Sequence, residues 1–322
     1  MVSGLRKHFG GFEAVRGIDF QVDRGEVFGF LGPNGAGKST TISMLCTLVR
    51  PSAGSAAVAG YDVATQRDDV RRHIGLVFQD TTLDPNLTGA QNLRMHAELY
   101  GVEKRLVDAR MEQVLRMVAL WDRRDQRVLT YSGGMRRRLE IARGLMHSPR
   151  VLFLDEPTVG LDPQTRASIW GYIRELRANE EITIFMTTHY MDEAEFCDRI
   201  AIMDHGEIVA IDTPAALKDS VGHDTVRIQT EDDDRAITRL AEQFGIEAVI
   251  SEGAVTFGVE AGEAFVPRLF ADLEVRIRSV NVNRPTLDDV FMKYTGASIR
   301  DVEQFDTKAQ NRVVMQVLGG RR

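Results

Sequence analysis

The chain has 322 residues, which is enough for one large domain or two ordinary ones. A hydrophobic content of 43% and a charged content of 27% are typical of a globular protein that buries a core. The formal net charge of −7 argues against a general nucleic-acid binder, because such proteins bind phosphates through a basic surface. Because of this acidic balance we expect no nucleic-acid partner. No run of about 18 apolar residues occurs in the sequence, so we also expect no membrane span.

Short apolar runs separated by helical stretches predict an α/β domain over residues 1–220. The runs suit strands that are buried on both faces, and their alternation with helices indicates a mostly parallel sheet. Between them, residues 83–146 have helical spacing and no convincing strand, which predicts an inserted helical subdomain. The four predicted strands are Val27–Leu31, Val151–Leu154, Ile182–Thr187 and Ile200–Met203.

The strand pattern restarts near residue 221, so residues 221–296 are predicted to form a separate accessory domain. Its βαββαβ order is typical of a small α+β, ferredoxin-like domain. Residues 297–322 are polar and are predicted to form a tail. Because this fold carries many functions, three roles stay open for the accessory domain: regulation, dimerisation of subunits, or a passive spacer.

A glycine-rich segment follows the first predicted strand and matches G-x-x-x-x-G-K-[ST] at every fixed position. Its glycines let backbone N–H groups point at phosphate oxygens, and the following helix presents its positive end to the same anion. Lys38 can place a charge on the outer phosphates, and the Ser39 hydroxyl can ligate Mg²⁺. The segment predicts nucleotide binding through Gly32, Pro33, Asn34, Gly35, Ala36, Gly37, Lys38, Ser39 and Thr40.

Two carboxylates, Asp155 and Glu156, follow the second predicted strand, at the end where α/β sheets bind ligands. Asp155 is a candidate Mg²⁺ ligand. Glu156 is a candidate general base for the attacking water, a role worth about 10²–10⁴-fold in rate. Ser132 is a good helix N-cap beside two glycines that expose N–H groups to an anion. Taken alone, His189 is more often structural, and Gln79 carries no information.

In this order, the elements resemble the ATP-binding subunit of an ABC transporter over residues 1–220. The phosphate loop resembles its Walker A motif, Val151–Glu156 its Walker B motif, and Tyr131–Met135 its signature motif. Three single residues take family positions on the same basis: Gln79 as the Q-loop glutamine, Asp162 as the D-loop aspartate, and His189 as the switch histidine.

The resemblance implies an ATPase in which ATP lies between two copies of the chain, arranged as a head-to-tail homodimer. Glu156 would activate water, and Lys38 and His189 would hold the γ-phosphate. The second copy would complete each site with its signature residues Ser132, Gly133 and Gly134, beside the D-loop Asp162. The resemblance also implies Mg²⁺ at Ser39, Gln79 and Asp155.

Adenine stacking is implied at Phe9, which stands where the family usually has a tyrosine. The nearby Phe12 competes for this role. Near the C-terminus, Pro285–Phe291 is similar to the end of the accessory domain in the daunorubicin-resistance branch of ABC exporters. The segment Tyr131–Arg138 also resembles the corresponding segment of that branch. The implied function is efflux of a small hydrophobic or drug-like molecule through a separate membrane permease, at the cytoplasmic face of a bacterial membrane.

Two other classes fit less well. Non-transport ABC proteins that act on ribosomes or DNA typically carry tandem cassettes or a coiled coil, whereas this acidic chain has one cassette and no heptad run. The other class is an unrelated P-loop enzyme, such as a GTPase or a small-molecule kinase. A GTPase needs an N-K-x-D motif, and the sequence contains none. The run Arg136–Arg138 is interpreted as a solvated basic face.

Overall fold

The computed structural model describes residues 1–179, 181–222, 224–251 and 253–296. They divide into two compact units, of which the first comprises Met1–Asp212 and the second begins at Thr213. The second unit therefore starts before the boundary placed at residue 221, because helix α8 (Pro214–Val221) packs on the later helix α11 (Leu287–Thr295). The polar tail expected at residues 297–322 lies outside the described residues.

A six-stranded sheet in the order β10-β9-β3-β8-β7-β6 forms the centre of the first unit. Neighbouring strands from β9 to β6 run parallel, and only β10 pairs antiparallel, so the predicted mostly parallel sheet is confirmed. The whole of β3 and β8 is buried. The sequence of β3 is uniformly apolar, as expected for a strand covered on both faces, whereas β8 has an apolar centre and ends in the buried threonines Thr187 and Thr188. The strands are β3 (Val27–Leu31), β6 (Ile74–Val77), β7 (Val151–Asp155), β8 (Thr183–Thr188), β9 (Arg199–Asp204) and β10 (Glu207–Asp212).

A second, antiparallel sheet in the order β2-β1-β4-β5 was not predicted from the sequence. Register shifts interrupt the pairing of β1, so its buried positions Val2 and Leu5 are three residues apart instead of two. This irregularity hides the period-two alternation that marks a half-buried strand. The strands are β1 (Val2–Phe9), β2 (Phe12–Phe20), β4 (Ala53–Val58) and β5 (Tyr61–Asp62).

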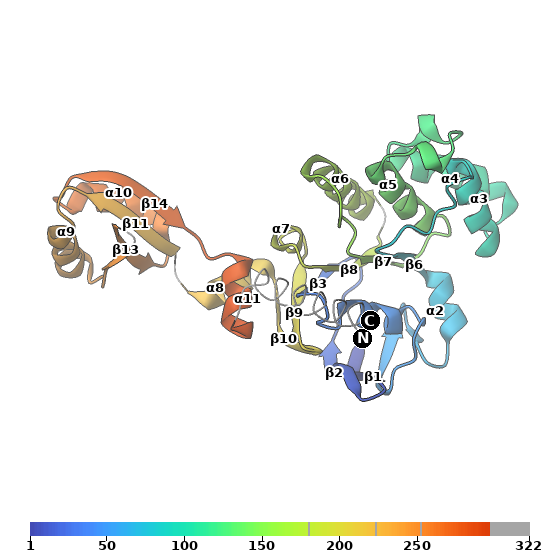
Figure 1. Cartoon of the computed structure of the whole chain (residues 1–322), viewed down its shortest axis with the longest axis horizontal. Coiled ribbons are helices and arrows are strands. Elements are labelled where there is room, and N and C mark those ends of the chain that lie inside the picture. The colour runs from blue at the N-terminus through green and yellow to red at the C-terminus, as the bar shows by residue number, and fades with distance from the viewer. Residues whose placement is uncertain (180, 223, 252, 297–322) are drawn as a thin grey trace, which may run out of the picture. The chain divides into compact units, whose positions relative to one another are not determined.

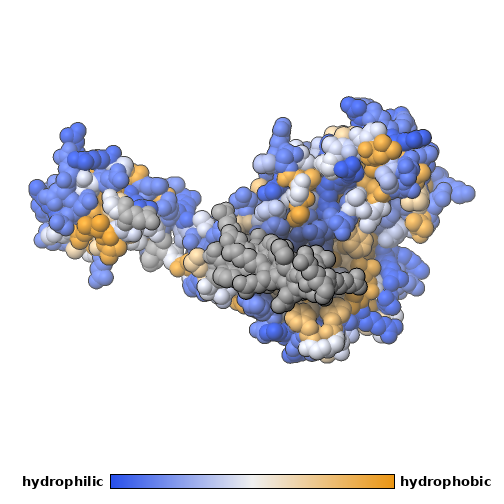
Figure 2. Space-filling view, in the orientation of Figure 1, coloured by the Kyte–Doolittle hydropathy of each residue, from blue (hydrophilic) through white to orange (hydrophobic). Residues whose placement is uncertain are grey.

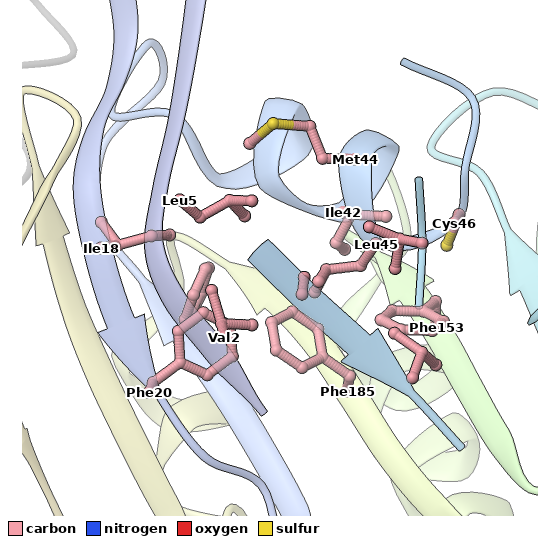
Figure 3. Close-up of a cluster of buried hydrophobic side chains, with 14 of the residues drawn as sticks. Val2, Leu5, Ile18, Phe20, Ile42, Met44, Leu45, Cys46, Phe153 and Phe185 are labelled. Atoms are coloured by element: carbon pink, nitrogen blue, oxygen red, sulfur yellow. The ribbon is translucent and has the colours of Figure 1, made fainter. Parts of the chain in front are cut away.

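The main hydrophobic core lies between these two sheets (Figure 3). Val2, Leu5, Ile18 and Phe20 approach from the antiparallel sheet, and Phe153 and Phe185 approach from the parallel one. Helix α1 (Lys38–Leu45) contributes buried side chains to the same core, among them Ile42 and Leu45. Helix α1, which follows the phosphate loop, therefore contacts strands of both sheets.

Three helices form the predicted helical subdomain and gather on one side of the parallel sheet, beside β6 and β7, in Figure 1. They are α3 (Gly89–Leu99), α4 (Lys104–Met117) and α5 (Gly133–Gly144), with short 3₁₀ turns at Trp121–Arg123 and Val128–Thr130. The remaining helices of this unit are α2 (Arg67–His73), α6 (Pro163–Asn179) and α7 (Met191–Ala194). No helix among the described residues is long and apolar enough to cross a membrane.

The second unit contains an antiparallel sheet in the order β12-β13-β11-β14 (Figure 1). Helices α9 and α10 pack against it around a small core that includes Val226, Ile228 and Leu269. The chain order and the strand order are those of the expected βαββαβ domain. Its elements are β11 (Asp224–Thr230), α9 (Asp233–Arg239) with a π-helical turn at Leu240–Phe244, β12 (Val249–Ser251), β13 (Ala254–Val259), α10 (Gly262–Asp272) and β14 (Ile277–Asn283).

Candidate active site

The phosphate loop leaves β3 and enters α1 at the carboxyl edge of the parallel sheet. Gly37 is the N-cap of α1 with φ of 103°, a backbone conformation that favours glycine. At Gly32, an added Cβ would collide with the Met203 carbonyl oxygen, so no larger residue fits there. Gly35 also has a positive φ of 82°, and it is exposed at the tip of the loop. The loop is thus shaped to expose its N–H groups.

Lys38 is almost fully buried, and its ammonium group curls back over the loop. The Nζ atom donates to the carbonyl oxygens of Gly32 at 2.7 Å and Pro33 at 2.9 Å. It also lies 3.6 Å from Glu156 Oε1. The backbone of the phosphate loop therefore holds the Lys38 ammonium group, the charge that can bind the outer phosphates.

Ser39 and Asp155, two of the three predicted Mg²⁺ ligands, lie in direct contact. Ser39 Oγ donates to Asp155 Oδ1 at 3.0 Å, and Thr187 Oγ1 donates to the same oxygen at 2.5 Å. Hydroxyl and carboxylate oxygens at one point are the donor type that Mg²⁺ prefers when phosphates and water complete its shell. These residues therefore fit the ion.

Glu156 directly follows β7 and has a positive φ of 45°, which is uncommon for a residue with a side chain. Its backbone N–H donates to Thr187 Oγ1 at 3.0 Å, so one threonine orients both acidic residues. The Glu156 side chain is buried, and its Oε1 lies 3.4 Å from His189 Nδ1. The carboxylate therefore stands between Lys38 and His189.

The ionisation of Glu156 is decided by these neighbours. Burial raises the pKa of the carboxyl group, but the hydrogen bond from His189 and the charge of Lys38 more than offset it. The net pKa lies below the ordinary value for glutamate. Glu156 is therefore ionised at neutral pH, the state that a general base requires.

The other predicted site residues do not join this cluster through their described contacts. Ser132 caps α5 and accepts a hydrogen bond from the Met135 N–H, and Asp162 accepts two from Thr165 at the start of α6. Gln79 is exposed in the segment between β6 and α3. Phe9 and Phe12 are exposed partners across the β1–β2 hairpin, with exposed fractions of 49% and 61%.

Two residues of the site were missed in the sequence. Thr187 pairs in register with Asp155 across the parallel strands β7 and β8, a relation that becomes visible only once the strand order is known. Arg137 was assigned to a solvated basic face, and this is wrong because it is only 7% exposed. It donates to the carbonyl oxygens of Asp155 and Glu156 at 3.1 and 3.2 Å.

A parallel sheet with a glycine-rich loop before a helix, a buried lysine and a strand-end Asp-Glu pair defines a P-loop nucleotide-binding protein. Residues 15–159 match the ABC transporter family, and residues 213–295 match the C-terminal domain of DrrA1-3-like ATP-binding proteins. The chain belongs to the family of ABC transporter ATP-binding proteins, and it is an ATP-binding, ATP-hydrolysing subunit.

The similarity extends over almost the whole chain. It is 40% identical over 302 residues to the daunorubicin/doxorubicin resistance ATP-binding protein DrrA of Streptomyces peucetius, covering 91% of each chain. It is 38% identical to the linearmycin resistance ATP-binding protein LnrL of Bacillus subtilis, covering 92% of this chain and 98% of that protein. A dimeric ATP-binding cassette with ADP and Pi bound matches with a TM-score of 0.60 at 26% identity, covering 66% of this chain and 97% of that one.

Proposed function

We propose that this chain powers the efflux of a small hydrophobic or drug-like molecule through a separate membrane permease. It would act at the cytoplasmic face of a bacterial membrane. The observation that carries the catalytic part is the contact of one buried carboxylate, Glu156, with both Lys38 and His189. The efflux part is supported by relatives that are named for resistance to daunorubicin, doxorubicin and linearmycin.

In the proposed reaction, Lys38 and the N–H groups of Gly32–Thr40 hold the β- and γ-phosphates of ATP. Glu156 accepts a proton from the attacking water, and its lowered pKa keeps it in the ionised state that this step needs near neutral pH. His189 then contacts the γ-phosphate as negative charge develops on it. Lys38 leaves its two backbone carbonyls when a phosphate oxygen offers a stronger partner.

A bound Mg²⁺ would supply positive charge that stabilises the phosphates as they react. Ser39 and Asp155 would hold it, and Gln79 would reach it from the following loop. The support for the first two is their mutual hydrogen bond, which brings both oxygens to one point. Thr187 would keep the Asp155 carboxylate in place for the ion.

A second copy of the chain would complete each ATP site. The support is that Ser132 and Gly133 are exposed at the N-terminus of α5, where helix N–H groups can bind an anion. Gly134 behind them is buried, and a Cβ there would collide with Thr165 Cγ2, near the helix cap made by Asp162. A structural neighbour that is a dimeric ATP-binding cassette with ADP and Pi bound also supports a dimer.

The permease would contact the helical subdomain near Gln79. Several large apolar side chains of this region are exposed, and Figure 2 shows hydrophobic surface over α3 and α4. Exposed apolar patches of this kind mark interaction sites. The residues are Phe78, Met95, Leu99, Tyr100 and Leu106. For the adenine base, we keep Phe9 as the stacking residue and Phe12 as its competitor.

The variant Glu156→Gln tests the catalytic assignment. It keeps the size of the side chain and removes the base, so we expect ATP binding to persist while the hydrolysis rate falls about 10²–10⁴-fold. The variant should also accumulate as an ATP-bound dimer. The measurements are steady-state phosphate release, nucleotide affinity and size-exclusion chromatography with ATP.

Asp192→Asn is the matched control, because Asp192 is an exposed acid just beyond His189. Its hydrolysis rate should equal that of the wild type. Normal turnover in Glu156→Gln would refute the role of Glu156. If cells that contain the wild-type chain and its permease export none of the tested drugs, only the efflux part of the proposal would be refuted.

A further inference from the structure

Arg137 joins two parts of the molecule that are distant in sequence. On one side its guanidinium donates to three successive carbonyl oxygens, those of Asp155, Glu156 and Pro157, the last at 2.6 Å. On the other side it donates to the carbonyl oxygen of Phe78, directly before Gln79. A planar group with five donors is the only side chain that can serve this many acceptors at once.

The same face of α5 also holds the segment that we name the Gln79 loop (residues 78–88, between β6 and α3). Glu140 Oε1 accepts from the Thr82 N–H at 2.6 Å, and Glu140 Oε2 accepts from Arg137 at 3.2 Å. Arg143 donates to the Thr82 carbonyl oxygen at 3.0 Å. These three side chains recur every three residues, so they lie on one stripe of the helix.

The backbone of Glu156 needs such support. A non-glycine residue at φ of 45° is strained and persists only where its surroundings hold it. Thr187 holds the N–H of Glu156, and Arg137 holds its carbonyl oxygen. Both contacts are buried, so they exclude water as a replacement partner. A small displacement of Arg137 would therefore move the carboxylate.

We infer that Arg137 is a positioning residue for Glu156, which it holds in the hydrolytic geometry and ties to the Gln79 loop. The inference rests on the proposed role of Glu156 as the base. The charge of Arg137 is compensated in place by Glu140, which is itself almost fully buried. Movement of the Gln79 loop, the segment proposed to meet the permease, is thereby passed to the catalytic carboxylate of the same chain.

The test compares kcat and KM for ATP in Arg137→Gln and Arg137→Lys of the full chain. Glutamine cannot reach all four carbonyls, and lysine keeps the charge but loses the planar fork. We expect kcat to fall about 10–100-fold, the scale of a misplacement near 1 Å, while KM stays within about threefold. Thermal unfolding, followed by circular dichroism, shows whether each variant is folded at the assay temperature.

A double-variant cycle separates positioning from a general structural role. If Arg137 acts through Glu156, adding Arg137→Gln to Glu156→Gln lowers the single-turnover rate no further. Arg138→Gln is the matched control, because Arg138 is the next residue on α5 and donates to the Val118 carbonyl and the Tyr172 hydroxyl. Its kcat should remain within about twofold of the wild type.

Three results would overturn the inference: losses that multiply in the double variant, a wild-type kcat in Arg137→Lys, or unfolding of both Arg137 variants, which would make the arginine structural. Failure of the proposed function looks different. In that case Glu156→Gln would hydrolyse ATP at the wild-type rate, and the inference would fall with it.

Discussion

The charge states of Glu156 and His96 show how neighbours act on single residues. Burial alone favours the neutral form of both groups. At Glu156, His189 and Lys38 reverse that effect and the pKa falls. At His96 the neighbours act in the same direction as burial: burial, Arg143 and His147 together lower its pKa to about 3. Near pH 7 the folded chain therefore keeps a charged carboxylate in the site and a neutral imidazole in the helical subdomain.

His96 should make the chain less stable as the pH falls. The unfolded chain binds a proton at this residue below a pH of about 6.5, whereas the folded chain does not until about 3. The stabilisation of the fold by the neutral His96 is complete above a pH of about 6.5 and is lost as the pH falls toward about 3. We expect His96→Phe to flatten the decline in the free energy of unfolding between pH 6.5 and 5 by up to about 1 kcal/mol per pH unit. Urea unfolding at several pH values measures it.

Phenylalanine suits this position because the His96 ring packs against the Tyr100 ring, with the centroids 4.4 Å apart. In addition, Nε2 of His96 has no hydrogen-bond partner among the described residues. His205→Asn is the control at an exposed histidine, and its free energy of unfolding at pH 7 should match that of the wild type. An unchanged slope in His96→Phe would show that another group causes the decline.

At the scale of elements, α5 serves two ends of the proposed mechanism. Its N-terminus presents Ser132 and Gly133 toward solvent, where a second copy would use them. Its side carries Arg137, Glu140 and Arg143, which bind the Gln79 loop and the end of β7. A helix is rigid over this length. A movement of the Gln79 loop is therefore expected to move the signature residues at the N-terminus of α5 as well.

Removing Glu140 should release the Gln79 loop while the sheet stays closed. Glu140→Ala deletes a buried, charged hydrogen-bond acceptor of the Thr82 N–H, a contact worth about 1.5–3 kcal/mol. We expect amide hydrogen exchange at residues 80–84 to become roughly 10–100-fold faster, and exchange in β7 to remain unchanged. Mass spectrometry of peptides from the intact chain measures both regions.

Glu112→Ala is the control for this experiment, since Glu112 pairs with Arg116 on the exposed side of α4. It should leave exchange at residues 80–84 unaltered. Equal acceleration throughout the first unit of Glu140→Ala would mean global destabilisation, and the specific anchoring of the loop would be refuted.

At the scale of the whole molecule, the division into two units determines where the chain can be cut. The second unit begins at Thr213, so α8 belongs with α11 and not with the ATPase unit. Leu217 of α8 is buried, and Lys293 of α11 donates to the carbonyl oxygen of Ser220. A cut after Gly222 would therefore leave a helix without its partner.

We expect a chain ending at Asp212 to be soluble and to bind ATP with wild-type affinity. A chain ending at Gly222 exposes the apolar face of α8 and should aggregate more readily. Size-exclusion chromatography and nucleotide titration of both variants test this. Equal behaviour of the two would place α8 with the ATPase unit. In the shorter variant, unchanged hydrolysis, dimerisation and transport would leave only the spacer role for the second unit.

Much of the architecture could be predicted because its signals are local. The strands β3, β7, β8 and β9 each contain a short apolar run, and the βαββαβ order of the second unit follows from successive short patterns. The antiparallel sheet was missed because register shifts in β1 break its alternation. The prediction for the basic run at Arg136–Arg138 was wrong because charge alone does not show which side of a helix is buried.

The sequence by itself determined the phosphate loop and the Asp155-Glu156 pair. Glycine spacing, a lysine and the end of an apolar strand act over a few residues, so no distant contact is needed to recognise them. Only the tertiary structure decided which partners hold Glu156. Thr187 and Arg137 come from other elements, and their contact with it depends on strand order, helix rotation and burial, which arise only when the chain is packed.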